Sequence, residues 1–402
     1  MKTLIVVCDG MADRPIGKLG GKTPLEFAKT PNMDNFAKKG ICGIFDPIAP
    51  GIRAGSDTAH LAILGYDPYK VYTGRGPFEA AGVGLEVLPG DIAFRCNFAT
   101  TNEDNVVTDR RAGRIKEGTK KLAETISNIP IEGIKHLFKE STDHRAALVL
   151  RGEDLSFKVS DSDPHFAGKP VENIRPLDDS SEASRTAQLL NKFLDDVHKV
   201  LKNHEVNAKR LKEGKPPANT LLLRGAGVVP HLEKFNEKYG MEGACISTMG
   251  LVRGIGNLCG LDVLKVPIDI KIEDACKKAS SELDNYDFLL LNIKDPDNAA
   301  HDHDAQKKTR IIEDIDSALS VFSRFIEENY LVVLSDHTTA IKYGDHTGDP
   351  VPIMICGPEV RTDDVESFGE RAAVKGGLNR IRGQDIMNIL MNLTYRIEKF
   401  GA

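Results

Sequence analysis

The 402-residue sequence predicts an α/β protein whose core is a mostly parallel sheet flanked by helices, with a smaller α/β or α+β domain inserted into it. Three observations carry this prediction. Short apolar runs rich in leucine or β-branched residues are typical of buried parallel strands. An amphipathic helical pattern separates two of these runs, which makes a strand–helix–strand unit. The first run stands at the N-terminus and the others near the C-terminal third, so the sheet joins both ends of the chain.

The core strands are predicted from four apolar runs, and we expect all four to be parallel. They are Leu4–Cys8, Phe288–Ile293, Leu331–Leu334 and Val351–Cys356. Between the second and third runs, apolar side chains recur at steps of three and four residues, which predicts a helix with one apolar face. Its apolar positions are Ile311, Ile315, Leu319, Phe322 and Ile326.

The middle of the chain, residues 67–239, is predicted to be the inserted domain, and the core is then discontinuous, with residues 1–66 and 240–402. The middle contains shorter apolar runs and one long amphipathic helix. The apolar face of that helix is Ala183, Ala187, Leu190, Leu194, Val197 and Leu201. A basic, proline-containing segment from Lys209 to Pro217 is expected to be a solvated loop.

Composition argues against several classes of protein. The 53 Lys and Arg residues against 59 Asp and Glu give a net charge of −6, so no basic excess favours nucleic acid or an anionic membrane. No stretch approaches the roughly 20 apolar residues that span a bilayer, and the apolar run before Asp9 is too short for a signal peptide. Seven scattered cysteines without a CxxC pair indicate a reduced protein, so we expect a cytoplasmic location. The sequence assigns no oligomeric state.

Acidic residues and histidines follow the predicted core strands. Because the carboxyl ends of parallel strands meet at one edge of an open sheet, we expect these side chains to converge there. They are Asp9, Asp297, His301, Asp336, His337 and His346. Carboxylate oxygen with imidazole nitrogen suits Zn²⁺ or Mn²⁺ better than Ca²⁺ or Mg²⁺. Six ligands are too many for one tetrahedral site, so we expect two ions, a pair that clamps the oxygens of a transferring phosphoryl group.

Each of these residues also has a purely structural explanation. Asp9-Gly10 after a strand is commonly a turn, and Asp297 would serve as a helix N-cap. A lone His337 or His346 is often only hydrogen-bonded, and His303 is out of phase with the helical pair Asp297–His301. The joint pattern at three strand ends is what favours a metal site.

A candidate nucleophile, Ser56, lies in the stretch GSDTAH from Gly55 to His60. We expect it at a helix N-terminus, where free N–H groups and the positive end of the helix dipole favour an alkoxide and a bound phosphate. Coordination to a divalent ion would activate the serine further. The alternative is that Ser56 is simply an N-cap, worth about 1 kcal/mol.

Five motifs follow one another along the chain: Asp9-Gly10, GSDTAH, Asp297 with His301, SDH at 335–337, and Asp345-His346-Thr347 followed by Pro350-Val351-Pro352. In this order and combination they resemble those of the cofactor-independent phosphoglycerate mutases of the alkaline phosphatase superfamily, most closely the archaeal-type branch. The resemblance covers essentially the whole chain and implies an alkaline-phosphatase-like core with an inserted, substrate-covering domain.

The resemblance also implies roles for individual residues. One ion would be held by Asp297, His301 and His346, and the other by Asp9, Ser56, Asp336 and His337. In the inserted domain it suggests His165 as the catalytic histidine that faces the substrate, with Asp163 beside it for proton handling. Binding of the substrate's phosphate or carboxylate is assigned to Arg224, Arg110, Arg111 and Arg114, and, from the core, to Arg253 and Lys294.

The function that this resemblance implies is the glycolytic interconversion of 3-phosphoglycerate and 2-phosphoglycerate through a phosphoserine. It would use two divalent ions, zinc or manganese, and no 2,3-bisphosphoglycerate. The alternatives are a phosphopentomutase or a metal-dependent phosphatase on the same core, since the inserted domain alone would choose the substrate. A third hypothesis is a non-catalytic protein that binds phosphometabolites, for which Ser56→Ala would leave function intact.

Overall fold

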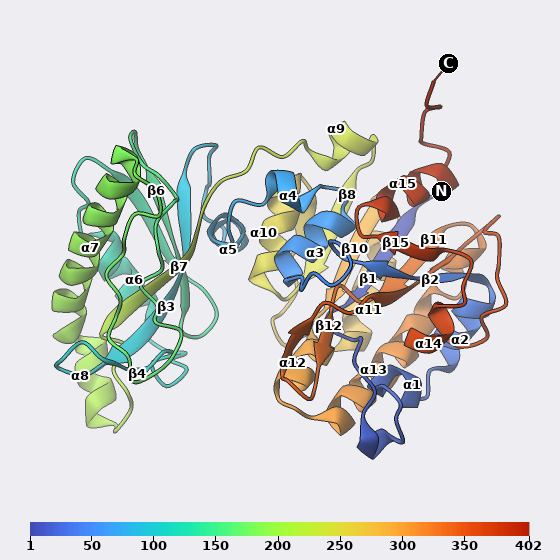
Figure 1. The fold of residues 1–402 in the computed structure, drawn as a ribbon, viewed down its shortest axis with the longest axis horizontal. Helices are drawn as coiled ribbons and strands as arrows, with labels where there is room; N and C mark the ends of the chain where they lie inside the picture. Colours follow the sequence, from blue (N-terminus) through green and yellow to red (C-terminus); the bar gives the residue numbers. More distant parts are fainter. Residues whose placement is uncertain (402) are drawn as a thin grey trace. The chain divides into compact units, whose positions relative to one another are not determined.

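The computed structural model describes residues 1–401, which form two compact units (Figure 1). The first unit contains Met1–Val71 and the chain from Leu232 onward, and the second contains Tyr72–His231. The expected boundaries, after residues 66 and 239, lie five and eight residues away from these. The difference arises because the flanking segments pack within the first unit: Tyr66 Oη donates to the carbonyl of Glu233 at 2.8 Å, and Tyr239 Oη donates to that of Leu64 at 3.0 Å.

The core of the first unit is a sheet of eight strands. They are β1 (Thr3–Cys8), β2 (Gly40–Asp46), β8 (Gly243–Ser247), β9 (Asp262–Leu264), β10 (Phe288–Ile293), β11 (Tyr330–Leu334), β14 (Val351–Cys356) and β15 (Asn379–Arg382). Their order across the sheet is β15-β2-β14-β11-β1-β10-β8-β9. All except β14 run in one direction, so the predicted mostly parallel sheet is confirmed.

The prediction that Val351–Cys356 is a parallel strand is wrong. This strand, β14, is antiparallel to β11. Only 16 residues join the two strands, and they contain the short hairpin of β12 (Thr338–Ala340) and β13 (Asp345–Thr347). Without a crossover helix the chain returns beside β11 in the opposite direction, and an apolar run alone does not reveal direction.

The central strands end level with one another. Every residue of β1, β10 and β11 is buried, which explains why these strands appear in the sequence as unbroken apolar runs. Cys8 at the end of β1 pairs with Ile293, and Val7 pairs with Leu334. The residues that follow these three strands therefore emerge together at one edge of the sheet.

Helices cover both faces of this sheet (Figure 1). On one face, Phe36, Cys276 and Ile315 pack with Leu4 and Val6 in a buried apolar cluster. On the other face α10 approaches closely, because a Cβ at its Gly256 would lie 3.2 Å from Cys245 Cβ. The helices of the first unit are α1 (Pro24–Phe27), α2 (Pro31–Lys38), α3 (Ser56–Ile63), α4 (Pro68–Val71), α9 (Phe235–Tyr239), α10 (Gly250–Cys259), α11 (Ile272–Glu282), α12 (Asp295–His301), α13 (Ala305–Leu319), α14 (Glu370–Ala373) and α15 (Asp385–Leu393).

The helical pattern predicted from Ile311 to Ile326 is confirmed up to Leu319, where α13 ends. Two 3₁₀ turns, Ser320–Phe322 and Phe325–Glu327, continue it, and their apolar residues Phe322 and Ile326 are buried with the same cluster. A third 3₁₀ turn spans Gly17–Leu19.

The second unit is an antiparallel sheet packed with helices, so it belongs to the α+β type. Its strands are β3 (Ile92–Thr101), β4 (Val107–Asp109), β5 (Lys135–Glu140), β6 (Arg145–Arg151) and β7 (Thr220–Val228), and its helices are α5 (Gly76–Gly82), α6 (Thr119–Ser127), α7 (Ser181–Lys202) and α8 (Glu205–Lys212). Strands β6 and β7 flank β3. Helices α6 and α7 lie on one face of the sheet and α5 on the other (Figure 1).

The predicted amphipathic helix of the middle region is confirmed as α7, whose apolar face is buried except for the partly buried Leu194. The prediction that Lys209–Pro217 is a solvated loop is wrong in its first half, which lies in α8. Arg210 is buried there, because its guanidinium donates to the carbonyls of Pro216 and Ala112, each at 2.8 Å.

No helix among residues 1–401 combines the length and the apolar composition that crossing a membrane requires. The seven cysteines of the chain are all buried free thiols.

A buried ion pair ties the segment after β1 to the hairpin after β11. Lys308 of α13 is fully buried, and its Nζ donates to Asp13 Oδ2 at 2.8 Å. The same ammonium donates to the carbonyls of Ala12 at 3.1 Å and Thr339 at 3.0 Å. One cation thus holds together the two segments that follow β1 and β11 at this edge of the sheet.

We expect Lys308→Met to lower the free energy of unfolding by about 3–5 kcal/mol, because the Asp13 carboxylate would stay buried without its partner. Urea denaturation measures this change. The matched control is Lys307→Met, because Lys307 forms an exposed ion pair with Asp302 and its loss should cost less than about 0.5 kcal/mol. Similar losses for the two variants would contradict the assigned role of the buried pair.

Candidate functional site

Three carboxylates are buried together at the carboxyl edge of the central strands. Asp9 follows β1, Asp336 follows β11 and Asp297 lies in α12, and each is at most 1% exposed. One ammonium, that of Lys294, lies between two of them, 2.9 Å from Asp9 Oδ1 and 2.6 Å from Asp297 Oδ2. Three carboxyl groups accompanied by one ammonium form a donor set that a divalent cation would neutralise.

The two side-chain oxygens of Asp336 differ in their hydrogen bonding. Its Oδ1 accepts a hydrogen bond from the backbone N–H of Gly10 at 3.0 Å. Its Oδ2 is buried with no hydrogen-bond donor among the described residues. Burial, followed by the charge of Asp9, raises the pKa of Asp336 well above its ordinary value. A cation bound beside Oδ2 would supply the missing partner, so the donor set fits a metal ion.

The histidines of the site present a bare Nε2 to these carboxylates. His301 Nδ1 contacts the carbonyl of Gly344 at 2.7 Å, and His346 Nδ1 contacts that of Ala54 at 2.8 Å. Because a carbonyl only accepts, each Nδ1 carries the hydrogen, and Nε2 keeps its lone pair in the neutral ring. This is the tautomer that binds a metal, with the ring oriented by its outer hydrogen bond.

His337 reaches the same tautomer through a longer chain of hydrogen bonds. Thr339 Oγ1 donates to Asp297 Oδ1 at 2.7 Å, so its lone pair accepts from His337 Nδ1 at 2.9 Å. The bare His337 Nε2 then lies 3.1 Å from Ser56 Oγ, 3.3 Å from Asp336 Oδ2 and 3.6 Å from Asp9 Oδ1. Burial, followed by the neighbouring His346, lowers the pKa of His337 well below its usual value, so the ring is neutral.

Two groups of ligand atoms lie close enough to hold an ion each: Asp297, His301 and His346, and Asp9, Asp297 and His337. The atoms of each group lie within 4.8 Å of one another. The first group is the set that the resemblance implied for one ion. The second group shares Asp9 and His337 with the other implied set. The remaining members of that set, Ser56 and Asp336, lie beside His337. The structure thus brings all seven predicted ligands into one cluster, with Asp297 common to both groups.

Ser56 is the first residue of α3 and is buried. The alternative that it is a helix N-cap is wrong, because Gly55 is the N-cap and Thr58 Oγ1 accepts from the Gly55 N–H at 3.2 Å. The Ser56 hydroxyl contacts His337 Nε2 instead. The serine therefore combines a helix N-terminus with direct contact to the candidate ligands.

Three residues of the site were not singled out from the sequence. His60 Nδ1 donates to the Ser56 carbonyl at 2.7 Å, and its Nε2 lies 3.4 Å from Asn292 Nδ2. Asn292 also donates to Asp9 Oδ2 at 3.2 Å, and Thr339 orients His337. The spacing of four residues between Ser56 and His60 was a usable signal. His303, the out-of-phase candidate, donates to the carbonyl of Ile341 and belongs to neither ligand group.

In the second unit, Asp163 gathers two of the predicted substrate-binding arginines. Arg110 forms a fork on its carboxylate, with distances of 2.9 and 2.5 Å, and Arg224 Nη1 lies 3.7 Å from Asp163 Oδ2. Burial acts to raise the pKa of Asp163, but the hydrogen bonds from Arg110 and from the His165 N–H outweigh it, and the pKa lies below its ordinary value. The exposed His165 ring lies 3.3 Å from Asp161.

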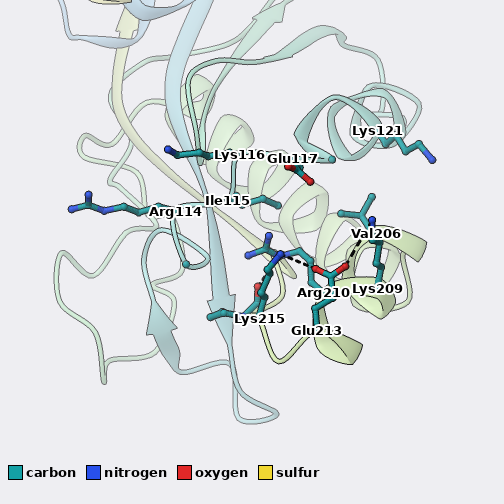
Figure 2. Close-up of a pocket in the computed structure, with 13 residues that line it drawn as sticks. Arg114, Ile115, Lys116, Glu117, Lys121, Val206, Lys209, Arg210, Glu213 and Lys215 are labelled. Atoms are coloured by element: carbon teal, nitrogen blue, oxygen red, sulfur yellow. Dashed lines mark hydrogen bonds and ion pairs between the residues drawn. The ribbon is translucent and has the colours of Figure 1, made fainter. Parts of the chain in front are cut away.

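Arg111 and Arg114 are exposed on the segment that follows Arg110. Arg114 also borders a cleft of about 460 Å³, where Glu213 pairs with Lys215 and Lys209 (Figure 2). Figure 2 shows the Arg114 side chain pointing away from those ion pairs.

The two predicted phosphate contacts in the first unit have different surroundings. Lys294 lies among the carboxylates, where burial opposes its charge but Asp9 and Asp297 hold the pKa above its usual value. Arg253 lies in α10, a helix that packs on α3, the helix that begins at Ser56.

The chain is similar along its full length to known proteins. A family model described as 2,3-bisphosphoglycerate-independent phosphoglycerate mutase matches residues 37–207. A protein of that name from Methanothermobacter thermautotrophicus is 56% identical, with 100% of both chains covered, and one from Methanocaldococcus jannaschii is 52% identical over 100% of this chain and 99% of its own.

Two solved structures are also similar to this chain. The PH0037 protein from Pyrococcus horikoshii has a TM-score of 0.87 and 40% identity, over 100% of this chain and 99% of its own. A cofactor-independent phosphoglycerate mutase from Thermoplasma acidophilum has a TM-score of 0.73 and 40% identity, over 98% and 100%.

We expect Thr339→Val to lower the affinity for Mn²⁺ or Zn²⁺ by roughly 10- to 100-fold, because His337 loses the hydrogen bond that fixes its tautomer and orientation. Calorimetric titration of the metal-free protein measures this. The control is Thr338→Val, one residue earlier in β12, whose hydroxyl donates to the carbonyl of Asp349. Unchanged affinity in the Thr339 variant would remove Thr339 from the proposed site.

Proposed function

The chain belongs to the family of 2,3-bisphosphoglycerate-independent phosphoglycerate mutases, which are isomerases, and we propose that it interconverts 3-phosphoglycerate and 2-phosphoglycerate through a phosphoserine at Ser56. The observation that carries the proposal is the contact between Ser56 Oγ and His337 Nε2 inside a buried cluster of three carboxylates. A serine held at a helix N-terminus among metal-ligand side chains suits nucleophilic attack on phosphorus.

We propose that two divalent ions, Zn²⁺ or Mn²⁺, bind in this cluster. Asp297, His301 and His346 would hold one ion, and Asp9, Ser56, Asp336 and His337 the other. Bound there, such ions would stabilise the negative charge that develops on the phosphoryl oxygens and on the serine oxygen. His60 and Thr339 orient the serine backbone and the His337 ring, and Lys294 remains protonated beside the carboxylates.

The reaction runs in two balanced halves. In the first, Ser56 Oγ loses its proton and bonds to phosphorus, the bond from phosphorus to the glycerate oxygen breaks, and that oxygen takes up a proton. In the second, the other hydroxyl of glycerate loses its proton and bonds to phosphorus, the bond from phosphorus to Ser56 Oγ breaks, and Ser56 Oγ takes up a proton. The phosphoryl group moves between two oxygens of one molecule, so 2,3-bisphosphoglycerate is not required.

We propose that the second unit is the substrate-covering domain and binds the part of the substrate that is not transferred. Its candidate residues are Arg110, Arg111, Arg114 and Arg224, whose planar forks match carboxylate and phosphate groups. His165 and Asp163 are assigned to proton handling, because imidazole and carboxyl side chains serve as general acids and bases. Exclusion of water is essential, because hydrolysis of the phosphoserine would turn a mutase into a phosphatase.

We propose a cytoplasmic location, which the seven unpaired cysteines support. The net charge of −6 supports a small-molecule substrate rather than a nucleic acid or a membrane as partner.

We expect the metal-loaded protein to convert 3-phosphoglycerate to 2-phosphoglycerate without added 2,3-bisphosphoglycerate, and Ser56→Ala to lose at least about 1,000-fold in rate, because the nucleophile is gone. Coupled assays give the rates, and mass spectrometry of acid-quenched protein should find one phosphoryl group on Ser56. The control is His303→Gln, a histidine outside both ligand groups.

Three outcomes would count against this function. Release of orthophosphate without 2-phosphoglycerate would indicate a phosphatase, and turnover of pentose phosphates instead would indicate a phosphopentomutase. Full activity in Ser56→Ala would exclude the phosphoserine route.

We expect metal affinity, and with it activity, to fall as the pH drops from about 8 to about 6, because protons compete for the ligand nitrogens. The hydrogen bond to Asp297 raises the pKa of His301, so this ring must release its proton at a higher pH than an ordinary histidine would. Calorimetry at the two pH values measures the change, and a chelator should abolish activity until Mn²⁺ or Zn²⁺ is restored. Activity that survives chelation would contradict the metal assignment.

A further inference from the structure

A single polar residue, Asn292, interrupts the apolar strand β10. Three of the apolar residues of this strand, Leu289, Leu291 and Ile293, belong to the cluster on one face of the sheet. Because side chains alternate along a strand, Asn292 lies on the opposite face, where α10 packs. The residue is only 4% exposed. A buried amide lowers stability unless its hydrogen bonds are made, so its partners explain why it is there.

The neighbouring strand β8 fixes the direction in which the Asn292 amide faces. Ser247 is the direct cross-strand partner of Asn292, and Ser247 Oγ lies 2.9 Å from Asn292 Oδ1. The same Oγ accepts the Met249 N–H at 3.0 Å, which leaves its own hydrogen to donate to Oδ1. With Oδ1 engaged in this way, the two hydrogens of Asn292 Nδ2 face the functional site.

Those two hydrogens reach two residues of the site. Asn292 Nδ2 donates to Asp9 Oδ2 at 3.2 Å and lies 3.4 Å from His60 Nε2. On the other side of the ring, His60 Nδ1 donates to the Ser56 carbonyl at 2.7 Å. A carbonyl only accepts and an amide nitrogen only donates, so the ring carries one hydrogen, on Nδ1, and accepts with Nε2. The chain of hydrogen bonds therefore has one consistent direction from β8 to the serine helix.

The bond to Asn292 also determines which oxygen of Asp9 is left for an ion. Asp9 Oδ1 lies 2.9 Å from Lys294 Nζ and 3.6 Å from His337 Nε2, its fellow member of a ligand group. Asp9 Oδ2 is held by the amide. Rotation of the carboxylate would break that bond, so Oδ1 stays directed at the ligand group.

We infer that Asn292 is a positioning residue that couples the nucleophile to one of the two ligand groups. Its amide holds the Asp9 carboxylate directly and, through His60, the first turn of α3, which begins at Ser56. This rests on the proposed function, in which Asp9 is a metal ligand and Ser56 attacks phosphorus. A neutral amide suits the position, because it offers two donors and adds no charge to the buried carboxylates.

The first test is calorimetric titration of Mn²⁺ into the metal-free, full-length chain with Asn292→Leu, an apolar residue of similar size. We expect the affinity for the ion that Asp9 would hold to fall roughly 10- to 100-fold, as for loss of an outer hydrogen bond to a ligand, and the affinity for the other ion to stay unchanged. The matched control is Asn329→Leu, at the opposite edge of the same sheet, which loses only the bond from the Lys2 N–H and should bind both ions normally.

The second test separates the two branches of the amide. His60→Phe keeps an aromatic ring but removes the hydrogen bonds to Asn292 and to the Ser56 carbonyl. We expect kcat for 3-phosphoglycerate to fall roughly 10- to 100-fold because the serine is misplaced, with KM and Mn²⁺ affinity nearly unchanged. In the double variant with Asn292→Leu, kcat should fall no further than in Asn292→Leu alone, because the two residues act on Ser56 through one bond.

A third variant keeps the inference testable if Asn292→Leu does not fold. Ser247→Ala frees the amide to turn, so affinity for the same ion should fall several-fold, and Ser247→Thr should restore it.

Three outcomes would overturn the inference: equal weakening of both ions in Asn292→Leu, additive losses of kcat in the double variant, or unchanged Mn²⁺ affinity in Ser247→Ala. If the wild-type chain failed to interconvert phosphoglycerates, the proposed function would fall, whereas the Mn²⁺ titrations would still report whether Asn292 holds Asp9.

Discussion

The enclosure of three carboxylates at one edge of a parallel sheet is the constraint on which the first unit depends. Asp9, Asp297 and Asp336 are buried with a single ammonium among them. When ionised, their carboxylates repel one another unless cations bind between them. The surroundings are built to hold this cluster in place. Neutral imidazoles point their bare nitrogens inward, backbone carbonyls fix the outer ring nitrogens, and the buried Lys308 ties the two flanking segments together. Binding chemistry, rather than stability, explains why so much charge is buried there.

The second unit gathers positive rather than negative side chains. Its sheet collects arginines on one face, although the chain as a whole has a net charge of −6. Composition does not reveal this, because the effect arises from strand pairing: Arg95, Arg145 and Arg224 are far apart in sequence and become neighbours only through the register of β3 with β6 and β7. Within one chain, a local excess of negative charge suits cations and a local excess of positive charge suits an anionic substrate.

The sequence was sufficient for those parts of the site that follow from topology or family motifs. Parallel strands end together, so Asp9, Asp336 and His337 could be placed side by side, and the family resemblance is confirmed by identity over the full chain. Residues that act through another residue were missed, because Thr339 and His60 reveal their roles only by hydrogen bonds. The direction of β14 depends on the length of the connection from β11, which an apolar run does not encode. The helix at Lys209–Lys212 depends on the hydrogen-bond partners of Arg210, which a basic run does not encode.

The insertion of the second unit has a consequence for the order in which the molecule can be assembled. The strands of the second unit come from one continuous stretch, Tyr72–His231, whereas β1 pairs with β10 and β11 from the far end of the chain. During synthesis the second unit is complete while β1 and β2 still lack their neighbours, since domains generally fold as they emerge from the ribosome. The ligand cluster closes only after His346 has been made. A nascent chain therefore carries Ser56 without the histidine and carboxylates proposed to activate it until translation is nearly finished.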